Sequence, residues 1–178
     1  MSKLILHLCA DIGSDSQPYR DAGYEVICVG EKQDVRRFIP PPAVYGIIAN
    51  PPCTHLSGSG ARWWATKGES ALLEAMSIVD ACIRVVYVCK PKFWVLENPV
   101  GRLSRFLGKP VSTYQPYEYG DTYSKRTCLW GEFTMPKKTP VKPTEKDKIW
   151  NMPPSPERSN MRSICSKKFA QAFFEANP

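Results

Sequence analysis

The chain has 178 residues, of which 43% are hydrophobic and 23% are charged, a composition typical of a soluble protein with one domain of ordinary size. No apolar run approaches the ~20 residues that cross a bilayer, so we expect a cytoplasmic protein that uses no membrane. Seven cysteines without a CxxC pair, beside only two histidines, argue against a disulfide framework and against a metal site. The net charge of +7 favours an anionic partner such as nucleic acid or a nucleotide.

Short apolar runs rich in β-branched residues predict four buried strands, at residues 4–9, 24–29, 44–49 and 93–96. Between these runs, residues 17–22 suit a short helix, and residues 69–88 carry apolar side chains at helical spacing. This alternation predicts an α/β fold with a central, mostly parallel sheet flanked by helices. Ligands of such sheets bind beyond the carboxyl ends of the strands, so the residues that directly follow each run are the candidates for function.

The last third of the chain has a different composition. Residues 131–163 are rich in Pro and Lys, and proline at that density resists regular structure. We therefore predict an extended basic excursion there, closed by a terminal helix at about residues 166–175. No internal repeat is present, and residues 1–178 are predicted to form a single domain.

The sharpest motif is Asn50-Pro51-Pro52-Cys53-Thr54, directly after a predicted strand. Two prolines stiffen the turn and hold the Cys53 thiol where it can attack a bound ring. The reactive form is the thiolate, whose pKa of about 8.5 falls beside cations such as Arg62 or Arg126, if they lie near. The alternative is that Cys53 is a small buried apolar residue.

Glu97-Asn98-Pro99 follows another predicted strand and should lie on the same edge of the sheet. A thiol and a carboxyl at one edge suit methylation at carbon 5 of cytosine, where a nucleophile must first add to C6 and an acid must hold N3. The alternative for Glu97 is a helix cap or a surface charge.

With these two motifs in this order, the chain resembles the DNA (cytosine-5) methyltransferase family, particularly its short phage-type members, over most of its length. Pro51-Pro52-Cys53 resembles the family's Pro-Pro-Cys motif, and Glu97-Asn98-Pro99 resembles its Glu-Asn-Pro motif. The resemblance implies a Rossmann-like methyltransferase fold, S-adenosylmethionine as donor, and a covalent adduct between Cys53 and C6. It gives Cys53 and Glu97 catalytic roles and implies substrate contacts at Pro52, Thr54, Asn98 and Pro99.

The segment Arg126-Thr127-Cys128-Leu129-Trp130-Gly131 resembles the strand that follows the family's Gln-x-Arg-x-Arg motif. Arg126 falls on the last arginine, for which the resemblance implies a catalytic contact to the cytosine O2. Thr122 stands at the Gln position of the motif and Ser124 at its first Arg position, so this chain keeps one of the three defining residues.

The resemblance also implies where the donor binds: at Cys9, Asp11 and Gly13 after the first strand, and at Asn50 and Pro51. Gly13 keeps one glycine of the family's Phe-x-Gly-x-Gly turn, but Asp11 replaces the first, where a carboxylate could crowd the donor or select a modified one.

Two further residues belong to the predicted donor site. Glu31 suits the ribose hydroxyls and Asp34 the adenine amine, although each could equally be a solvated loop charge. His7 stands where the family often has an Asp.

The nature of the acceptor stays open between DNA, RNA and a free cytosine nucleotide. Family members that act at defined DNA sites carry a large recognition domain where this chain has only the Pro/Lys segment, and reading a duplex needs an element in the major groove. Because base flipping also costs roughly a few kcal/mol, we expect single-stranded DNA, a nucleotide, or duplex DNA with help from a second subunit or a second copy of the chain. Trp63 could stack on a base or pack an active-site lid.

Two alternative functions remain at this point. Asn50-Pro51-Pro52-Cys53 also resembles the Asn-Pro-Pro-aromatic motif of amino-methyltransferases, which need no thiol. A methyltransferase-like module that only binds nucleic acid or nucleotide is the other alternative, and Asp11 at the donor turn is its best support.

Overall fold

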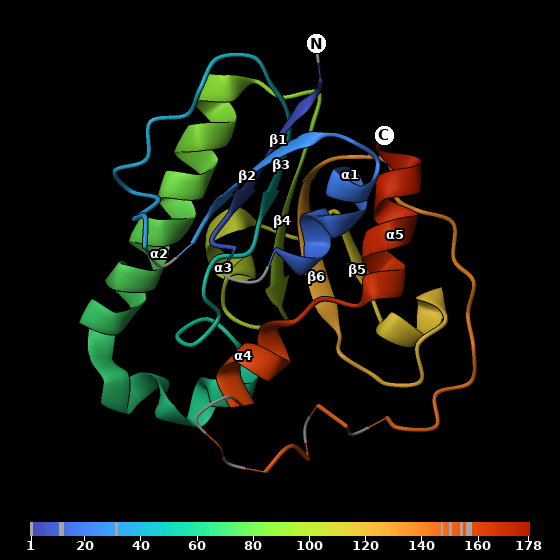
Figure 1. Ribbon diagram of the computed structural model, residues 1–178. Helices are drawn as coiled ribbons and strands as arrows, with labels where there is room; N and C mark the ends of the chain where they lie inside the picture. Colours follow the sequence, from blue (N-terminus) through green and yellow to red (C-terminus); the bar gives the residue numbers. More distant parts are fainter. Residues whose placement is uncertain are drawn as a thin grey trace.

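The computed structural model describes residues 2–10, 13–30, 32–146, 148–149, 151–153, 155 and 158–178. A six-stranded sheet with the order β2-β1-β3-β4-β6-β5 forms its centre (Figure 1). Four strands run parallel: β1 (Leu4–Leu8), β2 (Glu25–Val29), β3 (Val44–Ala49) and β4 (Phe93–Pro99). The sixth strand in the sequence, β6 (Thr127–Glu132), lies antiparallel between β4 and β5 (Ser112–Tyr114). The predicted α/β fold with a mostly parallel sheet is confirmed.

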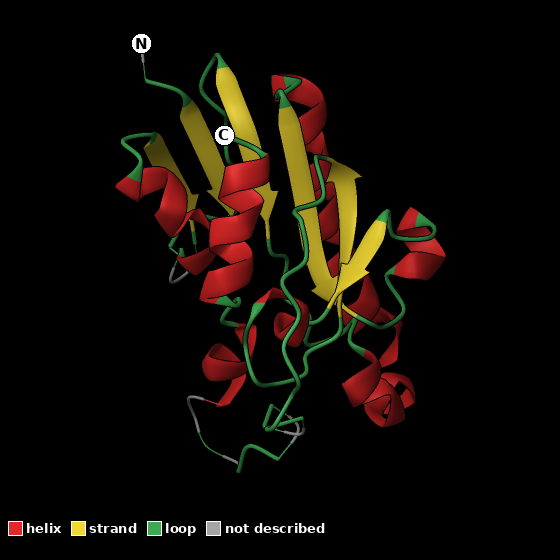
Figure 2. Ribbon diagram, turned by 90° about the vertical axis from the view of Figure 1, so that its right-hand side faces the viewer, coloured by secondary structure: helices red, strands yellow, loops and turns green. Residues whose placement is uncertain are grey.

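Helices cover both faces of this sheet (Figure 2). The long helix α2 (Trp64–Cys89) packs against one face, where its apolar side chains join those of Leu4, Leu6 and Leu8. The short helix α1 (Gln17–Asp21) and the terminal helix α5 (Lys167–Ala176) pack against the other face, where Ile5 points. The alternating side chains of β1 therefore supply both layers of the core, as expected of a strand buried on two sides.

The remaining helical elements are short: α3 (Ser104–Leu107), α4 (Arg158–Ser163) and the 3-10 turns η1 (Ser14–Ser16), η2 (Gly58–Trp63) and η3 (Pro116–Tyr119). No helix in the described part of the chain is long and apolar enough to cross a bilayer.

The predicted elements agree with the observed ones, with one difference that concerns function. The strand predicted at residues 93–96 continues to Pro99, so the Glu97 motif is the end of β4 rather than the loop after it. The reason is the antiparallel partner: β6 pairs Leu129 with Glu97 and Cys128 with Asn98. The hydrophobic pattern of one β-strand does not reveal which strand pairs with it.

Helix α2 contains a break close to its predicted start. Gly68 has φ 74° and ψ −177°, a backbone conformation that only glycine adopts readily. Regular helix therefore follows Gly68, in agreement with the predicted start at residue 69.

The prediction of an extended excursion over residues 131–163 is wrong at both ends. Gly131 and Glu132 complete β6, and residues 158–163 form α4, a segment that contains no proline. The described residues between β6 and α4 have neither helix nor strand, as the proline density predicts. The terminal helix begins one residue after its predicted start, because Ser166 caps it by accepting a hydrogen bond from Phe169 N at 3.0 Å.

Candidate active site

The two motif segments are joined at the carboxyl edge of the sheet. Cys53 lies in the turn after β3, where its carbonyl accepts hydrogen bonds from Leu56 N and Ser57 N at 2.9 and 2.8 Å. The Asn98 side chain, only 1% exposed, donates from Nδ2 to the Pro51 carbonyl at 2.8 Å. Asn98 therefore fastens the cysteine turn to the end of β4 and is buried beneath the surface.

Side chains from outside the motifs brace the same turn. Arg102 Nε donates to the His55 carbonyl at 2.8 Å, and its guanidinium lies 4.7 Å from the centre of the Trp64 ring. Lys67 Nζ donates to the Thr54 carbonyl at 3.1 Å. The backbone on both sides of Cys53 is thus held by the protein itself.

Glu97 lies in a network of polar side chains contributed by three strand ends. Asn50 Nδ2 donates to Glu97 Oε2 at 3.2 Å and to Asp15 Oδ2 at 2.9 Å. Asn50 Oδ1 lies 2.7 Å from Nε2 of His7, which is 2% exposed. A neutral or charged imidazole and two carboxyls therefore meet around one amide.

The environment of Cys53 and Glu97 shifts both pKa values upward. Burial raises the pKa of the Cys53 thiol, and the charge of Glu97 adds to this effect. Burial likewise raises the pKa of Glu97, and the charge of Asp15 raises it further, against the opposing charge of Lys125. Glu97 thus keeps a proton to higher pH than an exposed carboxyl, and it can act as a hydrogen-bond donor.

The cations that act on Cys53 are not the expected ones. The charges of Lys125 and Arg162 lower its pKa, in part offsetting burial, whereas Arg62 is exposed and lies 5.2 Å from the Trp63 ring. Arg126 is exposed, and its charge acts on Cys128. The expectation that Arg62 or Arg126 lowers the pKa of Cys53 is therefore corrected.

The reason is the direction of side chains along the segment that enters β6. Successive residues of an extended chain point to opposite sides, and Leu129 pairs with Glu97. Lys125 shares the side of Leu129, whereas Arg126 shares that of Cys128. Lys125 is also anchored, because its Nζ donates to the carbonyls of Ser163 and Ile164 at 3.4 and 3.2 Å.

The residues predicted to bind the donor are only partly described. Asp11 and Glu31 lie outside the described residues. Gly13 has φ 67°, and a side chain there would meet Arg20 and Cys28 at 3.0 and 3.2 Å, so this position requires glycine.

The other predicted donor residues have protein partners. The Cys9 side chain points toward α2, with its sulfur 3.8 Å from that of Cys82. Asp34 forms a 2.8 Å ion pair with Arg36, which lowers the pKa of Asp34. Pro51 is buried.

The residues predicted to contact the acceptor are mostly accessible. Pro52 and Thr54 are exposed, Pro99 is partly exposed, and the Trp63 side chain is 51% exposed. An exposed tryptophan beside the cysteine turn offers a face for stacking.

Sequence reasoning did not single out Asp15, Lys125, Arg162 or Arg102, all of which contact or act on this site. The alternation of side chains along the strand, followed backwards from Gly131, would have indicated Lys125, whereas alignment to the family motif indicated Arg126. Asp15 and Arg102 carry no local signal, because their partners lie 35 and 47 residues away in the sequence.

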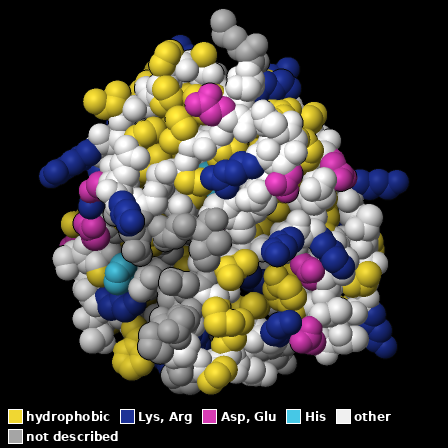
Figure 3. Space-filling view, in the orientation of Figure 1, with side chains coloured by type: hydrophobic (Ala, Val, Ile, Leu, Met, Phe, Trp, Pro, Cys, Tyr) yellow, Lys and Arg dark blue, Asp and Glu magenta, His cyan; other side chains and the backbone are white. Residues whose placement is uncertain are grey.

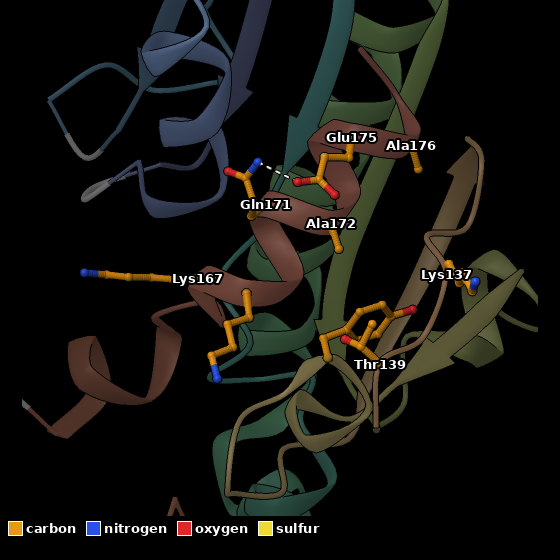
Figure 4. Close-up of a pocket in the computed structure, with 9 residues that line it drawn as sticks. Lys137, Thr139, Lys167, Gln171, Ala172, Glu175 and Ala176 are labelled. Atoms are coloured by element: carbon orange, nitrogen blue, oxygen red, sulfur yellow. Dashed lines mark hydrogen bonds between the residues drawn. The ribbon is translucent and has the colours of Figure 1, made fainter. Parts of the chain in front are cut away.

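A separate hollow lies between α5 and residues 137–139, with a volume of about 650 Å³ (Figure 4). None of the predicted site residues lines it. Figure 4 shows Lys167 directed away from the hollow, and Gln171 bonded to Glu175 at 2.9 Å. On the face shown in Figure 3, the Lys and Arg side chains are scattered among Asp and Glu rather than gathered into one block. The carboxyl edge of the sheet therefore remains the candidate site.

Comparison with known proteins gives a fold relationship. No protein family of known description and no curated protein matches the chain by sequence. Among the solved structures that match is a protein described as a candidate DNA modification methyltransferase encoded within a prophage of E. coli. The TM-score is 0.53 and the identity 14%, over 86% of this chain and 56% of that one. The chain thus has the α/β fold of that methyltransferase structure and spans just over half of its length.

Proposed function

We propose that the chain transfers a methyl group from S-adenosylmethionine to carbon 5 of cytosine. The observation that carries the proposal is that the Cys53 turn and Glu97 lie together at the carboxyl edge of the sheet, where Asn98 Nδ2 joins the turn to the end of β4 at 2.8 Å and burial raises the pKa of Glu97. The shared fold with a methyltransferase structure supports it.

In this reaction the Cys53 sulfur adds to C6 of the ring, and the electrons of the C5–C6 double bond move to C5. Glu97 donates its proton to N3, so that negative charge does not build on the ring. After C5 has taken the methyl group, the C5 proton leaves to a base, the C5–C6 double bond re-forms, N3 returns its proton to Glu97, and the Cys53 thiolate departs. Atoms and electrons balance, and Cys53 and Glu97 return to their starting forms.

The raised pKa of Cys53 means that the free protein holds mostly thiol at neutral pH. Lys125 and Arg162 are the groups that favour the thiolate, so we assign them to activating the nucleophile. Arg126 remains a predicted contact to the cytosine O2.

S-adenosylmethionine would supply the electrophilic methyl group. Gly13 suits a donor site, because it follows β1, which pairs with β2, and its left-handed conformation leaves no room for a side chain. We assign donor contacts to Gly13, Cys9, Pro51 and Asp34, with Asp11 and Glu31 as further predicted contacts.

The proposed acceptor is a cytosine in DNA or a free cytosine nucleotide. Between β6 and α5 the chain has only residues 133–166, fewer than a typical domain needs. We therefore propose single-stranded DNA or a nucleotide as the preferred acceptor, and duplex DNA with the help of a partner subunit or a second copy. Trp63, Pro52 and Thr54 are the exposed groups that we assign to the acceptor.

Amino-methylation is less well supported, because it needs the side-chain oxygen of Asn50, Oδ1, to accept a hydrogen bond from the exocyclic amine. That oxygen lies 2.7 Å from His7 Nε2. Asn50 therefore serves the network around Glu97.

Intact-mass spectrometry with 5-fluorocytosine tests the proposal, since fluorine at C5 blocks the final elimination and traps the adduct. With S-adenosylmethionine we expect a covalent species on a single-stranded oligonucleotide, a duplex or 5-fluoro-dCMP. It should be lost in Cys53→Ala and kept in the control Cys89→Ala, another partly buried cysteine. An adduct with none of the three acceptors would reject carbon-5 chemistry. Methylation of unmodified cytosine by Cys53→Ala at full rate would restore the amino-methyltransferase alternative.

A further inference from the structure

A continuous series of hydrogen bonds runs from the carboxyl end of β1 to Glu97. It passes from Gly13 through Ser16, His7 and Asn50. Ser16 Oγ donates to the Gly13 carbonyl at 3.1 Å and lies 2.8 Å from His7 Nδ1. His7 and Ser16 are 2% and 0% exposed, so solvent water does not compete for these bonds.

The direction of each bond follows from the donors available. The Ser16 proton is committed to Gly13, so the Ser16 oxygen accepts from His7 Nδ1–H. Both ring nitrogens of His7 then donate, because Asn50 turns its carbonyl oxygen toward Nε2. Burial alone would lower the pKa of His7, but hydrogen bonds to Cys28 and Asn50 and the charge of Asp15 raise it, in agreement with an imidazole that donates from both nitrogens.

The carboxyl groups on its other side fix the orientation of the Asn50 amide. Its Nδ2 faces Glu97 Oε2 at 3.2 Å and Asp15 Oδ2 at 2.9 Å. The flipped amide would put a carbonyl oxygen against two carboxyl oxygens, and the His7 N–H would meet an NH₂ group. Both contacts are unfavourable in a buried site.

We propose that Asn50, oriented by His7, is a positioning residue for Glu97. The Asn50 amide binds one carboxyl oxygen of Glu97 and leaves the other, with its proton, to face N3 of the cytosine. This inference rests on the proposed function. It replaces the prediction that the Asn50 side chain binds the donor, and it adds His7, for which the sequence indicated no role.

Other charged and titratable groups also interact electrostatically with Glu97. They are Asp15 on η1, Cys53 after β3, Tyr114 on β5, Lys125 ahead of β6, Cys128 on β6 and Cys165 ahead of α5. Among the effects on Glu97, the Asn50 hydrogen bond lowers its pKa. Removal of that bond should therefore raise the pKa of Glu97 further.

This change has a kinetic signature. The reactive form holds one proton between the Cys53 thiol and Glu97, so the rate falls on the acid side of the Glu97 pKa and on the alkaline side of the Cys53 pKa. Loss of the Asn50 bond should move the acid limb to higher pH and leave the alkaline limb nearly in place.

The experiment measures the rate of adduct formation with a 5-fluorocytosine oligonucleotide against pH, at saturating donor. We expect Asn50→Ala to slow the reaction by roughly tenfold, as for the loss of one intramolecular hydrogen bond, and to move the acid limb upward. Asn50→Asp, of nearly the same volume, should move it further because it adds a negative charge. His7→Gln should shift it in the same direction by a smaller amount. The control Ser14→Ala, which removes a different bond to Asp15, should leave the profile unchanged.

Two results would overturn the inference: slower reaction in folded Asn50→Ala or Asn50→Asp with an unmoved acid limb, or a loss that disappears at higher donor concentration. The second result would return Asn50 to the donor site. Failure of the wild-type protein to form any adduct would instead reject the proposed function, so the two failures are distinguishable.

Discussion

At the scale of single residues, the site depends on which of two neighbouring cations faces the catalytic pair. Lys125 is partly buried and acts on both Cys53 and Glu97, whereas Arg126 is exposed. The two side chains are one position apart in the sequence, yet the charge of Lys125, and not that of Arg126, is among the causes that shift the pKa values of Cys53 and Glu97. Alignment to the family motif points to Arg126, whereas the structure favours Lys125 as the cation that acts on Cys53 and Glu97.

We expect Lys125→Met to raise the pKa of Cys53, because it removes the cation that stabilises the thiolate. Alkylation of Cys53 by iodoacetamide near pH 8 should become roughly threefold to tenfold slower, since only the thiolate reacts. Peptide mass spectrometry resolves Cys53 from the other cysteines. Arg126→Met is the matched control and should react like the wild-type protein. An equal loss in both variants would assign the role to general surface charge.

At the scale of elements, the cysteine turn is held by the segment after β4. Ser57 and Gly101 form an isolated antiparallel bridge, and Gly58 N donates to the Val100 carbonyl at 2.8 Å. A side chain at Gly101 would overlap the Leu56 carbonyl and lie 2.8 Å from Gly58 N. Close approach of two backbones, one from each motif, is what requires glycine here.

Gly101→Ala should therefore displace the cysteine turn and destabilise the protein by about 1–3 kcal/mol, as overpacking does in dense interiors. We expect a lower thermal midpoint together with at least a tenfold slower adduct formation at Cys53. Gly60→Ala is the control, because its added carbon would meet only Thr54 O at an ordinary 3.8 Å. Unchanged adduct formation in Gly101→Ala would show that the turn is not held from this side.

At the scale of the whole molecule, the two chain ends meet at the edge of the sheet opposite the candidate site (Figure 1). The Asn177 side chain accepts from Thr134 N at 2.7 Å and donates to Thr134 O at 2.9 Å. Tyr19 donates to the Asn177 carbonyl, and Tyr45 and Lys3 donate to that of Pro178. These bonds join α5 to α1 and to the start of the sheet.

Asn177→Ala should leave both Thr134 backbone groups without their partner and cost about 1–3 kcal/mol. For a chain of this length, that corresponds to a fall in the thermal midpoint of roughly 2–10 °C. Methyl transfer below that temperature should be unaffected, because the position is remote from Cys53. Gln171→Ala, which removes only a surface bond to Glu175, should change the midpoint little, and a similar fall in both variants would argue against this role for Asn177.

The sequence by itself determined the order and type of the main elements and the identity of the two motif residues. Apolar runs with β-branched side chains marked four strands within about one residue at most ends, because burial on both faces imposes that composition locally. Cys53 and Glu97 were found for the same reason: each stands at or just after the end of such a run, and parallel strands bring those ends to one edge.

The tertiary structure alone decided how the candidate site is arranged. The antiparallel partner of β4 is β6, some 30 residues later in the sequence. Because of this pairing, the Glu97 motif is a strand end rather than a loop, and Lys125 rather than Arg126 acts on Glu97. The network of His7, Asp15 and Asn50 joins residues of β1, of η1 and of the turn after β3. Hydrogen bonds and charges act over a few ångströms in space, whereas sequence patterns register only neighbours along the chain, so contacts between distant segments have no local signature.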